Sequence, residues 1–342
     1  MIDTAPLSAT EVGLPYLSIL MPVRNEGRHI ANTLGGLLSQ DYPTDRYEVL
    51  IADGRSTDDT RNIVAAMATP NVRVLDNPGL LSSAGRNAAV RAARGDILVL
   101  VDGHCDLGGP NYLREIASAF ARSGADCVGR PQPLDVSGAT SLQRAIAAAR
   151  GCRLGHHPSS HIWAKHEGFV PPHSVAVAYQ REVFERVGMF DERFDACEDY
   201  EFNTRVASAG MSCFLTPQVT VHYTPRDSLL RLYRQMIRYG RGRIRLLRKH
   251  PGTFSPAVFV PAMFLLGLMV GPVIALLLPI LWLVYGACVG LYLFLVLGYT
   301  FTLAFRDLRT LPWLPPVFFA IHGGAAIGVL LELVFGPPGK EA

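Results

Sequence analysis

Acidic side chains stand directly after short apolar runs in the N-terminal half of this sequence. Asp53 follows one such run, and Asp102 and His104 follow another. Far along the chain, Glu198 and Asp199 lie side by side between glycine and aromatic residues. Carboxylates are ligands for divalent cations, and a carboxylate can also act as a general base. The pattern predicts a site for a nucleotide and a divalent cation, with one general base.

The elements that would position these residues alternate between strand and helix. Apolar runs of strand length alternate with segments of helical periodicity, which is typical of a parallel α/β sheet. In such sheets ligands bind outside the carboxyl ends of the strands. We therefore expect residues 22–26, Asp53 and 102–104 to lie at one edge of the sheet. The predicted strands are 17–21, 47–52, 72–75 and 97–101, and the predicted helices are 28–39, 56–67 and 83–94.

The C-terminal third has the composition of a membrane anchor. No charged residue occurs over 257–305, which is about twice the roughly 20 residues needed to cross a bilayer. Pro279 lies near the middle of this stretch, so we expect two helices there and a third after a basic turn. The expected membrane helices are 257–278, 281–304 and 313–335. The expected organisation is a soluble domain over 1–225, a basic amphipathic interface segment over 226–255, membrane helices over 256–336 and a tail over 337–342.

Charge distribution predicts the orientation of this anchor. Segment 226–249 holds nine basic residues and one acid, the turn at Pro279 is uncharged, and Arg306 and Arg309 follow. By the positive-inside rule the large domain faces the cytoplasm at the inner membrane, and three crossings place the C-terminus outside. The basic segment suits anionic lipid headgroups rather than nucleic acid, and we interpret arginines in 241–249 as membrane-adhesive. The first 16 residues do not have the form of a secretory signal peptide.

Six motifs in a fixed order carry a family resemblance. They are PVRNE (22–26), ADGRSTDDT (52–60), GRNAAVRAARGD (85–96), VDGH (101–104), GMFDERF (188–194) and EDYEFNTR (198–205). Together they resemble the family 2 glycosyltransferases of the GT-A fold. Residues 235–239 resemble the QxxRW element of that family, with Tyr239 in place of Trp. The Asp-x-His motif and the C-terminal membrane helices are most similar to the ExoA-like branch of succinoglycan biosynthesis.

The resemblance implies a nucleotide-sugar site. Asp53 would accept a hydrogen bond from the base, residues 22–26 would line base and ribose, and Arg86 would approach from the following helix. The alternatives are a turn or cap role for Asp53 and a plain surface cation for Arg86. The residues assigned to nucleotide-sugar binding are Pro22, Arg24, Glu26, Asp53, Arg86 and Asp102.

The same resemblance implies a metal pair, Asp102 and His104. Their donor atoms suit Mn²⁺ or Mg²⁺, which would act as a Lewis acid on the leaving diphosphate. His222 stands where some relatives supply a further contact, although a strand-end histidine without this role is the alternative. Asp106 would substitute if His104 points away. Five histidines over 156–173 have spacings that match no common zinc site.

The expected general base is Asp199, with Glu198 orienting it or the acceptor. Inverting transfer needs a carboxylate that takes the proton of the attacking hydroxyl. The alternative is an acid stabilised by a helix N-terminus. In the basic amphipathic segment, the family spacing assigns Gln235, Arg238 and Tyr239 to the diphosphate or acceptor.

The expected activity is inverting transfer of a sugar from a nucleotide sugar, a UDP-hexose by preference, to a polyprenyl-linked glycan in exopolysaccharide or cell-envelope synthesis. Nucleotide sugar, lipid-linked acceptor and membrane lipids are the expected partners. Two alternatives stay open. One is a polyprenyl-phosphate glycosyltransferase of the dolichol-phosphate-mannose-synthase type, whose phosphate acceptor needs no base. The other is a non-catalytic membrane scaffold that binds sugar nucleotides.

Overall fold

The computed structural model describes residues 13–155, 161 and 164–336, and the chain divides into two compact units. The first unit comprises Met1–Pro133, Ala164–Arg193 and Phe202–His222. The second comprises Leu134–Trp163, Phe194–Glu201 and Tyr223–Ala342. Of the histidines singled out above, His156 and His157 lie outside the described residues.

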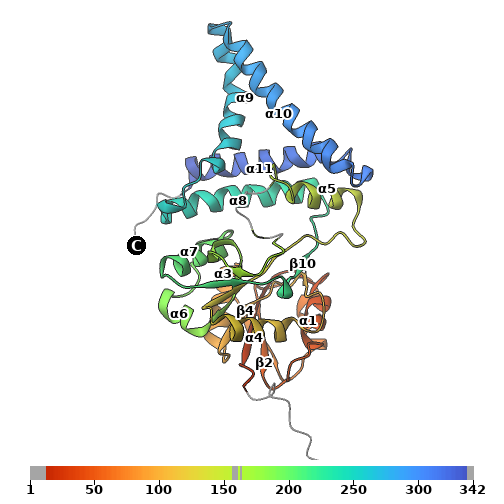
Figure 1. The fold of residues 1–342 in the computed structure, drawn as a ribbon, viewed down its shortest axis with the longest axis vertical. Helices are drawn as coiled ribbons and strands as arrows, with labels where there is room; N and C mark the ends of the chain where they lie inside the picture. The colour runs from red at the N-terminus through yellow and green to blue at the C-terminus, as the bar shows by residue number, and fades with distance from the viewer. Residues whose placement is uncertain (1–12, 156–160, 162–163, 337–342) are drawn as a thin grey trace, which may run out of the picture. The chain divides into compact units, whose positions relative to one another are not determined.

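The first unit is built on an eight-stranded sheet (Figure 1). Its strand order is β3-β2-β1-β4-β8-β6-β9-β7, and the first four strands are parallel. β8 runs antiparallel to both of its neighbours, and β7 runs antiparallel to β9. The strands are β1 (Leu17–Val23), β2 (Tyr47–Asp53), β3 (Val72–Asp76), β4 (Ile97–Leu100), β6 (Cys127–Gly129), β7 (Gly168–Phe169), β8 (Ala176–Gln180) and β9 (Cys213–Leu215). The predicted, mostly parallel α/β sheet is confirmed.

Register explains why the polar turns share one edge. In β1 and β2, Leu17 pairs with Tyr47 and Val23 pairs with Asp53, so both strands begin and end together. Leu20 of β1 pairs with Leu100 at the end of β4. β2 and β4 are buried throughout, which accounts for the unbroken apolar runs at 49–52 and 97–100 in place of alternation.

Helices flank this sheet, and an aromatic cluster fills part of its core. α3 packs against β1, β2 and β3. The rings of Phe190 and Phe202 stack with centroids 4.4 Å apart, and Tyr179 meets Phe202 edge-on at 5.3 Å. The helices are α1 (Ile30–Leu38), α2 (Thr60–Ala66), α3 (Ser82–Ala92), α4 (Tyr112–Ser123) and α6 (Arg181–Val187), and α7 (Glu198–Ser208) begins in the second unit.

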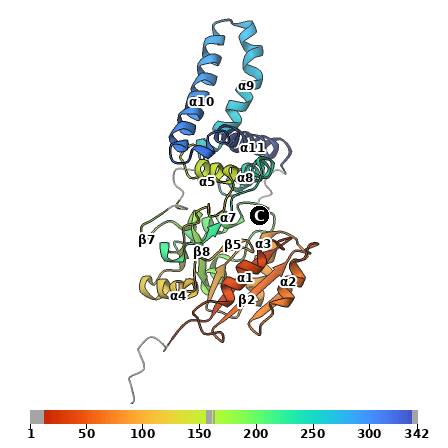
Figure 2. The same ribbon diagram turned by 90° about the vertical axis from the view of Figure 1, so that its right-hand side faces the viewer.

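The second unit is helical. Its helices are α5 (Ser141–Arg150), α8 (Leu229–Lys249), α9 (Val260–Leu277), α10 (Leu281–Ala304) and α11 (Leu314–Phe335). A capping box formed by Thr140 and Gln143 starts α5, and the Ser228 side chain caps α8. α8 and α11 lie side by side in both ribbon views, and α9 and α10 extend away from them as a hairpin (Figure 2).

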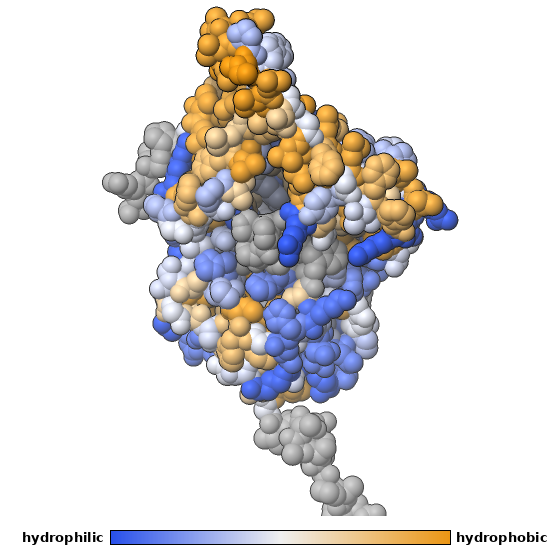
Figure 3. All heavy atoms as spheres, turned by 45° about the horizontal axis from the view of Figure 1, so that its top comes forward, coloured by the Kyte–Doolittle hydropathy of each residue, from blue (hydrophilic) through white to orange (hydrophobic). Residues whose placement is uncertain are grey.

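Three of these helices have the length and composition of membrane spans, as predicted. α9, α10 and α11 are each long and apolar enough to cross a bilayer. Hydrophobic residues gather over the projecting α9–α10 hairpin in the space-filling view (Figure 3). The hairpin turns at 278–280, around Pro279, because proline lacks the backbone N–H that a continuing helix requires.

Candidate active site

The predicted site residues fall into two groups, one in each unit. The first group lies at the carboxyl ends of β1, β2 and β4, where two loops interlock. The Asn25 N–H donates to Ser56 Oγ at 2.9 Å, and the Thr57 N–H donates to Asn25 Oδ1 at 2.8 Å. The Glu26 N–H donates to Thr60 Oγ1 at 2.8 Å. These bonds hold the PVRNE turn against the loop that follows Asp53.

Asp53 is a buried, ionised acceptor at the end of β2. Its exposed fraction is 1%, and Arg61 Nε donates to Oδ2 at 2.5 Å. Burial raises the pKa of Asp53, but hydrogen bonds from Ser56 and Arg61 lower it by more, so the pKa lies below its ordinary value. A cavity of about 290 Å³ opens beside this carboxylate and is lined in part by Val23, Ile51 and Leu75.

Arg86 is a buried residue, which excludes the surface-cation alternative. Its side chain is 7% exposed, its Nη2 lies 3.3 Å from Asp102 Oδ1, and its guanidinium lies 5.5 Å from the Phe190 ring centroid. Gly85 permits the close approach of α3, because a Cβ there would lie 3.0 Å from Pro22 Cβ. Arg86 therefore reaches the VDGH turn from within the core.

His104 pairs with Glu26, a contact that the sequence did not predict. His104 Nδ1 lies 3.0 Å from Glu26 Oε1, and the two side chains are 31% and 21% exposed. Asp102, at 30%, is also open to solvent. The contact between Glu26 and His104 thus links the PVRNE and VDGH motifs. The only signal for it was that both motifs follow parallel strands.

β5 (Cys105–Asp106) directly follows the proposed metal pair in the chain, and it pairs with β10 (His222–Tyr223) in a small second sheet. His222 lies close to Gly108, and Asp106 Oδ1 accepts the Gly108 N–H at 3.0 Å. Among the described residues, no three His, Cys, Asp or Glu side chains are grouped as a ready metal site. The ligand roles of Asp102, His104 and His222 stay predictions.

The second group begins at the N-terminus of α7. Cys197, just before this helix, has a positive φ of 63°, and Glu198 and Asp199 form the first turn. Asp199 is exposed, and its Oδ1 accepts the Tyr200 N–H at 2.7 Å. An exposed carboxylate in a first helical turn is stabilised by the helix dipole and stays accessible to a reactant. Both roles considered for Asp199 are compatible with this geometry.

α8 anchors the segment before these acids. Arg238 donates to the Asp195 carbonyl, and Arg245 Nη1 lies 2.5 Å from Asp195 Oδ1. Gly242 lets the backbones approach, since a Cβ there would lie 2.8 Å from the Ala196 carbonyl oxygen. Arg238, which belongs to the QxxRW-like element at 235–239, thus contacts the segment that precedes Glu198 and Asp199.

α8 also holds the residues that follow these acids. The Arg243 guanidinium lies 4.3 Å from the Tyr200 ring centroid. Glu201 is fully buried and pairs with Lys249 Nζ at 2.8 Å and His250 Nε2 at 3.0 Å. Sequence reasoning missed Glu201, although a third acid within one helical turn was the available signal.

The interpretation of 241–249 as a mainly adhesive surface is wrong in part, because most of its cations bind protein carboxylates. Arg241, Arg245 and Arg248 surround Glu332, and Lys249 binds Glu201. Long-range pairs of this kind leave no periodic signal in the sequence.

Gln235 and Tyr239 are neighbours one turn apart on α8. Gln235 Nε2 donates to Tyr239 Oη at 3.1 Å, and Tyr239 is 39% exposed. The guanidinium of Arg150 lies 5.8 Å from the Tyr239 ring centroid. The amide and the phenol are therefore held together at the surface of α8.

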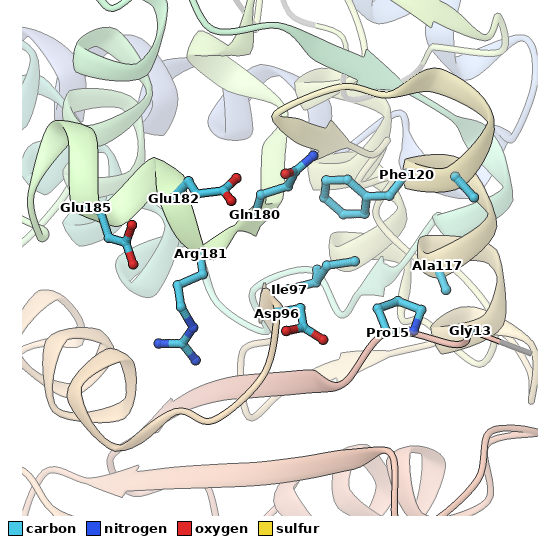
Figure 4. A pocket seen from close by; sticks show the side chains of 11 residues that line it. Gly13, Pro15, Asp96, Ile97, Ala117, Phe120, Gln180, Arg181, Glu182 and Glu185 are labelled. Carbon is cyan, nitrogen blue, oxygen red and sulfur yellow. The ribbon is translucent and has the colours of Figure 1, made fainter.

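Another pocket lies at the opposite edge of the sheet, lined in part by Pro15, Asp96, Ile97 and Arg181 (Figure 4). Its volume is about 460 Å³. Pro15 precedes β1 and Ile97 begins β4, so this pocket is at the amino ends of the strands. It is separate from the edge that holds Asp53 and Asp102.

The family model described as "Glycosyltransferase like family 2" matches residues 15–242. The chain belongs to glycosyltransferase family 2. This family 2 glycosyltransferase is 34% identical over 248 residues to the succinoglycan biosynthesis protein ExoA of Rhizobium meliloti (strain 1021), covering 71% of this chain and 74% of that protein. The predicted resemblance to the ExoA-like branch is confirmed.

A second relative agrees with the family, and a solved structure agrees with the fold. This glycosyltransferase is 25% identical to the dolichyl N-acetyl-alpha-D-glucosaminyl phosphate 3-beta-D-2,3-diacetamido-2,3-dideoxy-beta-D-glucuronosyltransferase of Methanococcus voltae, over 74% of this chain and 80% of that enzyme. Its fold is similar to that of the mannosyltransferase PcManGT from Pyrobaculum calidifontis, with a TM-score of 0.58 and 20% identity, covering 94% of this chain and 88% of that one. The GT-A fold is thereby confirmed.

Proposed function

We propose that this glycosyltransferase transfers a sugar, with inversion, from a nucleotide sugar to a lipid-linked glycan acceptor in exopolysaccharide or cell-envelope synthesis. The observation that carries the proposal is the exposed carboxylate of Asp199, whose flanking residues on both sides are anchored to α8. Anchoring holds the first turn of α7 in place while leaving the carboxylate accessible. That combination suits a general base for an incoming hydroxyl.

The names of the relatives support the acceptor class. One acts in succinoglycan biosynthesis, and another is named for transfer to a dolichyl-linked N-acetylglucosaminyl phosphate. Both names involve a growing glycan, and the second involves a lipid carrier. The apolar α9–α10 hairpin would keep this enzyme at the membrane where such an acceptor resides. We propose that the catalytic part faces the cytoplasm at the inner membrane, as its basic flanks predict.

Donor binding is assigned to the edge of the sheet in the first unit. The ionised Asp53 would accept the N–H of a uracil-like base in the adjoining cavity, which Val23 and Ile51 also line. Arg86 would set the Asp102 carboxylate in position through their contact at 3.3 Å. UDP-hexose is the proposed donor, because an ionised acceptor suits the ring N3–H of uracil, a donor that cytosine and adenine nucleotides lack.

A divalent cation fits the donor atoms of this edge. Asp102 and His104 are partly exposed and offer carboxylate and imidazole donors, and the Glu26 carboxylate contacts His104. The solved neighbour PcManGT was determined with GDP-Man and Mn²⁺. When bound, Mn²⁺ or Mg²⁺ would neutralise the charge of the diphosphate leaving group. Glu26 would hold the His104 ring in orientation, as second partners of metal-binding histidines do.

Replacement of Asp199 by Asn tests the proposal. The purified, detergent-solubilised chain is incubated with UDP-sugars and a lipid-linked glycan extract, with Mn²⁺ or with EDTA, and UDP release is followed. We expect Asp199→Asn to lower transfer about 10²–10⁴-fold, the usual contribution of general-base catalysis, and to leave UDP binding unchanged. Asp227→Asn is the matched control, since Asp227 is an exposed acid that pairs with Arg231 on α8 at 2.6 Å.

Other outcomes separate the alternatives. Full activity of Asp199→Asn toward a polyprenyl phosphate would indicate a phosphate acceptor, which needs no base. Nucleotide binding without release from any donor would indicate a scaffold. Either result refutes the assignment of Asp199 as general base.

A further inference from the structure

α11 is paired with α8 along its length, although its composition is that of a membrane span. The two helices run in the same direction, and small residues bring their backbones into contact. A Cβ on Gly324 would lie 2.7 Å from Met236 Cβ, and a Cβ on Gly240 would lie 2.5 Å from the Ala325 carbonyl oxygen. Glycine at such positions permits a close helix–helix approach. Figures 1 and 2 both show α8 and α11 side by side.

An ion cluster joins the C-terminal ends of the two helices. Glu332 of α11 is fully buried, and Arg241 Nε lies 2.8 Å from its Oε2. Arg245 Nε lies 2.9 Å from Oε1, and Arg248 Nη2 donates to the Glu332 carbonyl at 2.9 Å. A buried carboxylate requires partners of this kind. These contacts to Glu332 hold the C-terminal end of α11 against α8.

The N-terminal half of α11 is also packed against other helices of the protein. Leu314, Val317 and Phe318 are buried in a cluster that includes Ile146 of α5 and Leu232 of α8. Next along the helix, His322 Nε2 contacts the Leu154 carbonyl at 2.9 Å. In consequence, 44% of the most apolar 18-residue stretch of α11 is buried inside the protein. The corresponding fractions are 11% for α9 and 6% for α10.

α8 itself is too highly charged to cross a bilayer. It carries seven arginines and one lysine in 21 residues, and a cation at the bilayer centre is strongly unfavourable. Its alternation of leucine, isoleucine and basic residues is typical of a helix lying in the headgroup region. A helix packed in register along α8 must share its depth and direction.

We propose that α8 and α11 lie together in the membrane interface and that α9 and α10 alone cross the bilayer. Exposed apolar side chains of α11, such as Phe319, Val334 and Phe335, would face the acyl chains. α9 and α10 have 18 and 24 residues, or about 27 and 36 Å of helix, which matches a hydrocarbon core of about 30 Å. Two crossings place the end of the chain on the same side as the catalytic part. Three crossings, the expectation from sequence, place it on the opposite side.

Sided cysteine labelling of the full-length chain tests this topology. One variant carries a cysteine appended after Ala342, one carries Pro279→Cys in the hairpin turn, and one carries Ala66→Cys, at an exposed position of α2. Cells expressing each variant receive a membrane-impermeant maleimide before or after permeabilisation. The parent chain supplies the background from the native cysteines.

We expect the appended cysteine and Ala66→Cys to label together, on the side opposite to Pro279→Cys. Labelling of the appended cysteine on the same side as Pro279→Cys would show that α11 crosses, and would overturn the proposal. Labelling of all three on one side would overturn it too, because the hairpin would not cross. The appended residue leaves every contact of α11 intact, so misfolding does not confuse the result.

Discussion

Asp53→Asn should weaken nucleotide binding by a definite amount. A hydrogen bond to an ionised group contributes about 1.5–3 kcal/mol net. Asn keeps an oxygen acceptor but loses the charge, so we expect the lower part of this range. At about 1.4 kcal/mol per tenfold, UDP should bind about 10- to 30-fold more weakly. The substitution also weakens the ion pair between Asp53 and Arg61. Because Arg61 is half exposed, solvent screens its charge, and this loss adds little to the change in binding free energy.

Asp76→Asn is the matched control for this change. Asp76 is the second partner of Arg61, at 3.2 Å, but its side chain is 88% exposed. It pairs with Asp53 across β2 and β3, so it lies at the same sheet edge. Isothermal titration with UDP at neutral pH compares both variants with the parent chain. Unchanged affinity in Asp53→Asn, or an equal loss in Asp76→Asn, would refute the role of Asp53.

The lowered pKa of Asp53 adds a pH signature to this prediction. A carboxyl whose pKa is lower in the folded chain stabilises the fold above its unfolded value of about 3.9, and this contribution is lost as pH falls through the folded value. The stability advantage of the parent over Asp53→Asn should therefore be present near pH 5 and shrink in stronger acid. Denaturant unfolding of the two chains at several pH values measures the difference.

Two further predictions concern the metal pair and the α8–α11 contact. Asp102→Asn should raise the Mn²⁺ concentration needed for half-maximal UDP release at least tenfold, while Asp106→Asn should not; the reverse result would assign the metal to Asp106. Glu332→Gln should lower the free energy of unfolding in detergent by about 2–3 kcal/mol. Breaking a fully buried ion pair costs about 3–5 kcal/mol, and the loss here is smaller because the arginine partners of Glu332 are partly exposed. Asp307→Asn, at a half-buried pair with Arg144, should cost under about 1 kcal/mol, and equal losses in both variants would contradict the central position of Glu332.

Local sequence patterns were enough to predict most of the strands and helices and the polar turns that follow them. The buried strand ending at Asp53 and the apolar helix over 281–304 were predicted closely, because periodicity and composition report local structure. The order of the six motifs determined the family. These signals are local, so they do not depend on how distant segments pair.

The contacts between residues far apart in the chain could not be predicted without the fold. Arg86 could be solvated or buried on sequence alone, and packing of α3 against the sheet buried it beside Asp102. Glu332 lies 91 residues from Arg241, and Glu26 lies 78 residues from His104. The physical reason is that hydropathy records how much surface a segment must bury, whereas the partner that buries it is chosen by the whole fold. α11 has the composition of a membrane span, and its contact with α8 is what distinguishes it from α9 and α10.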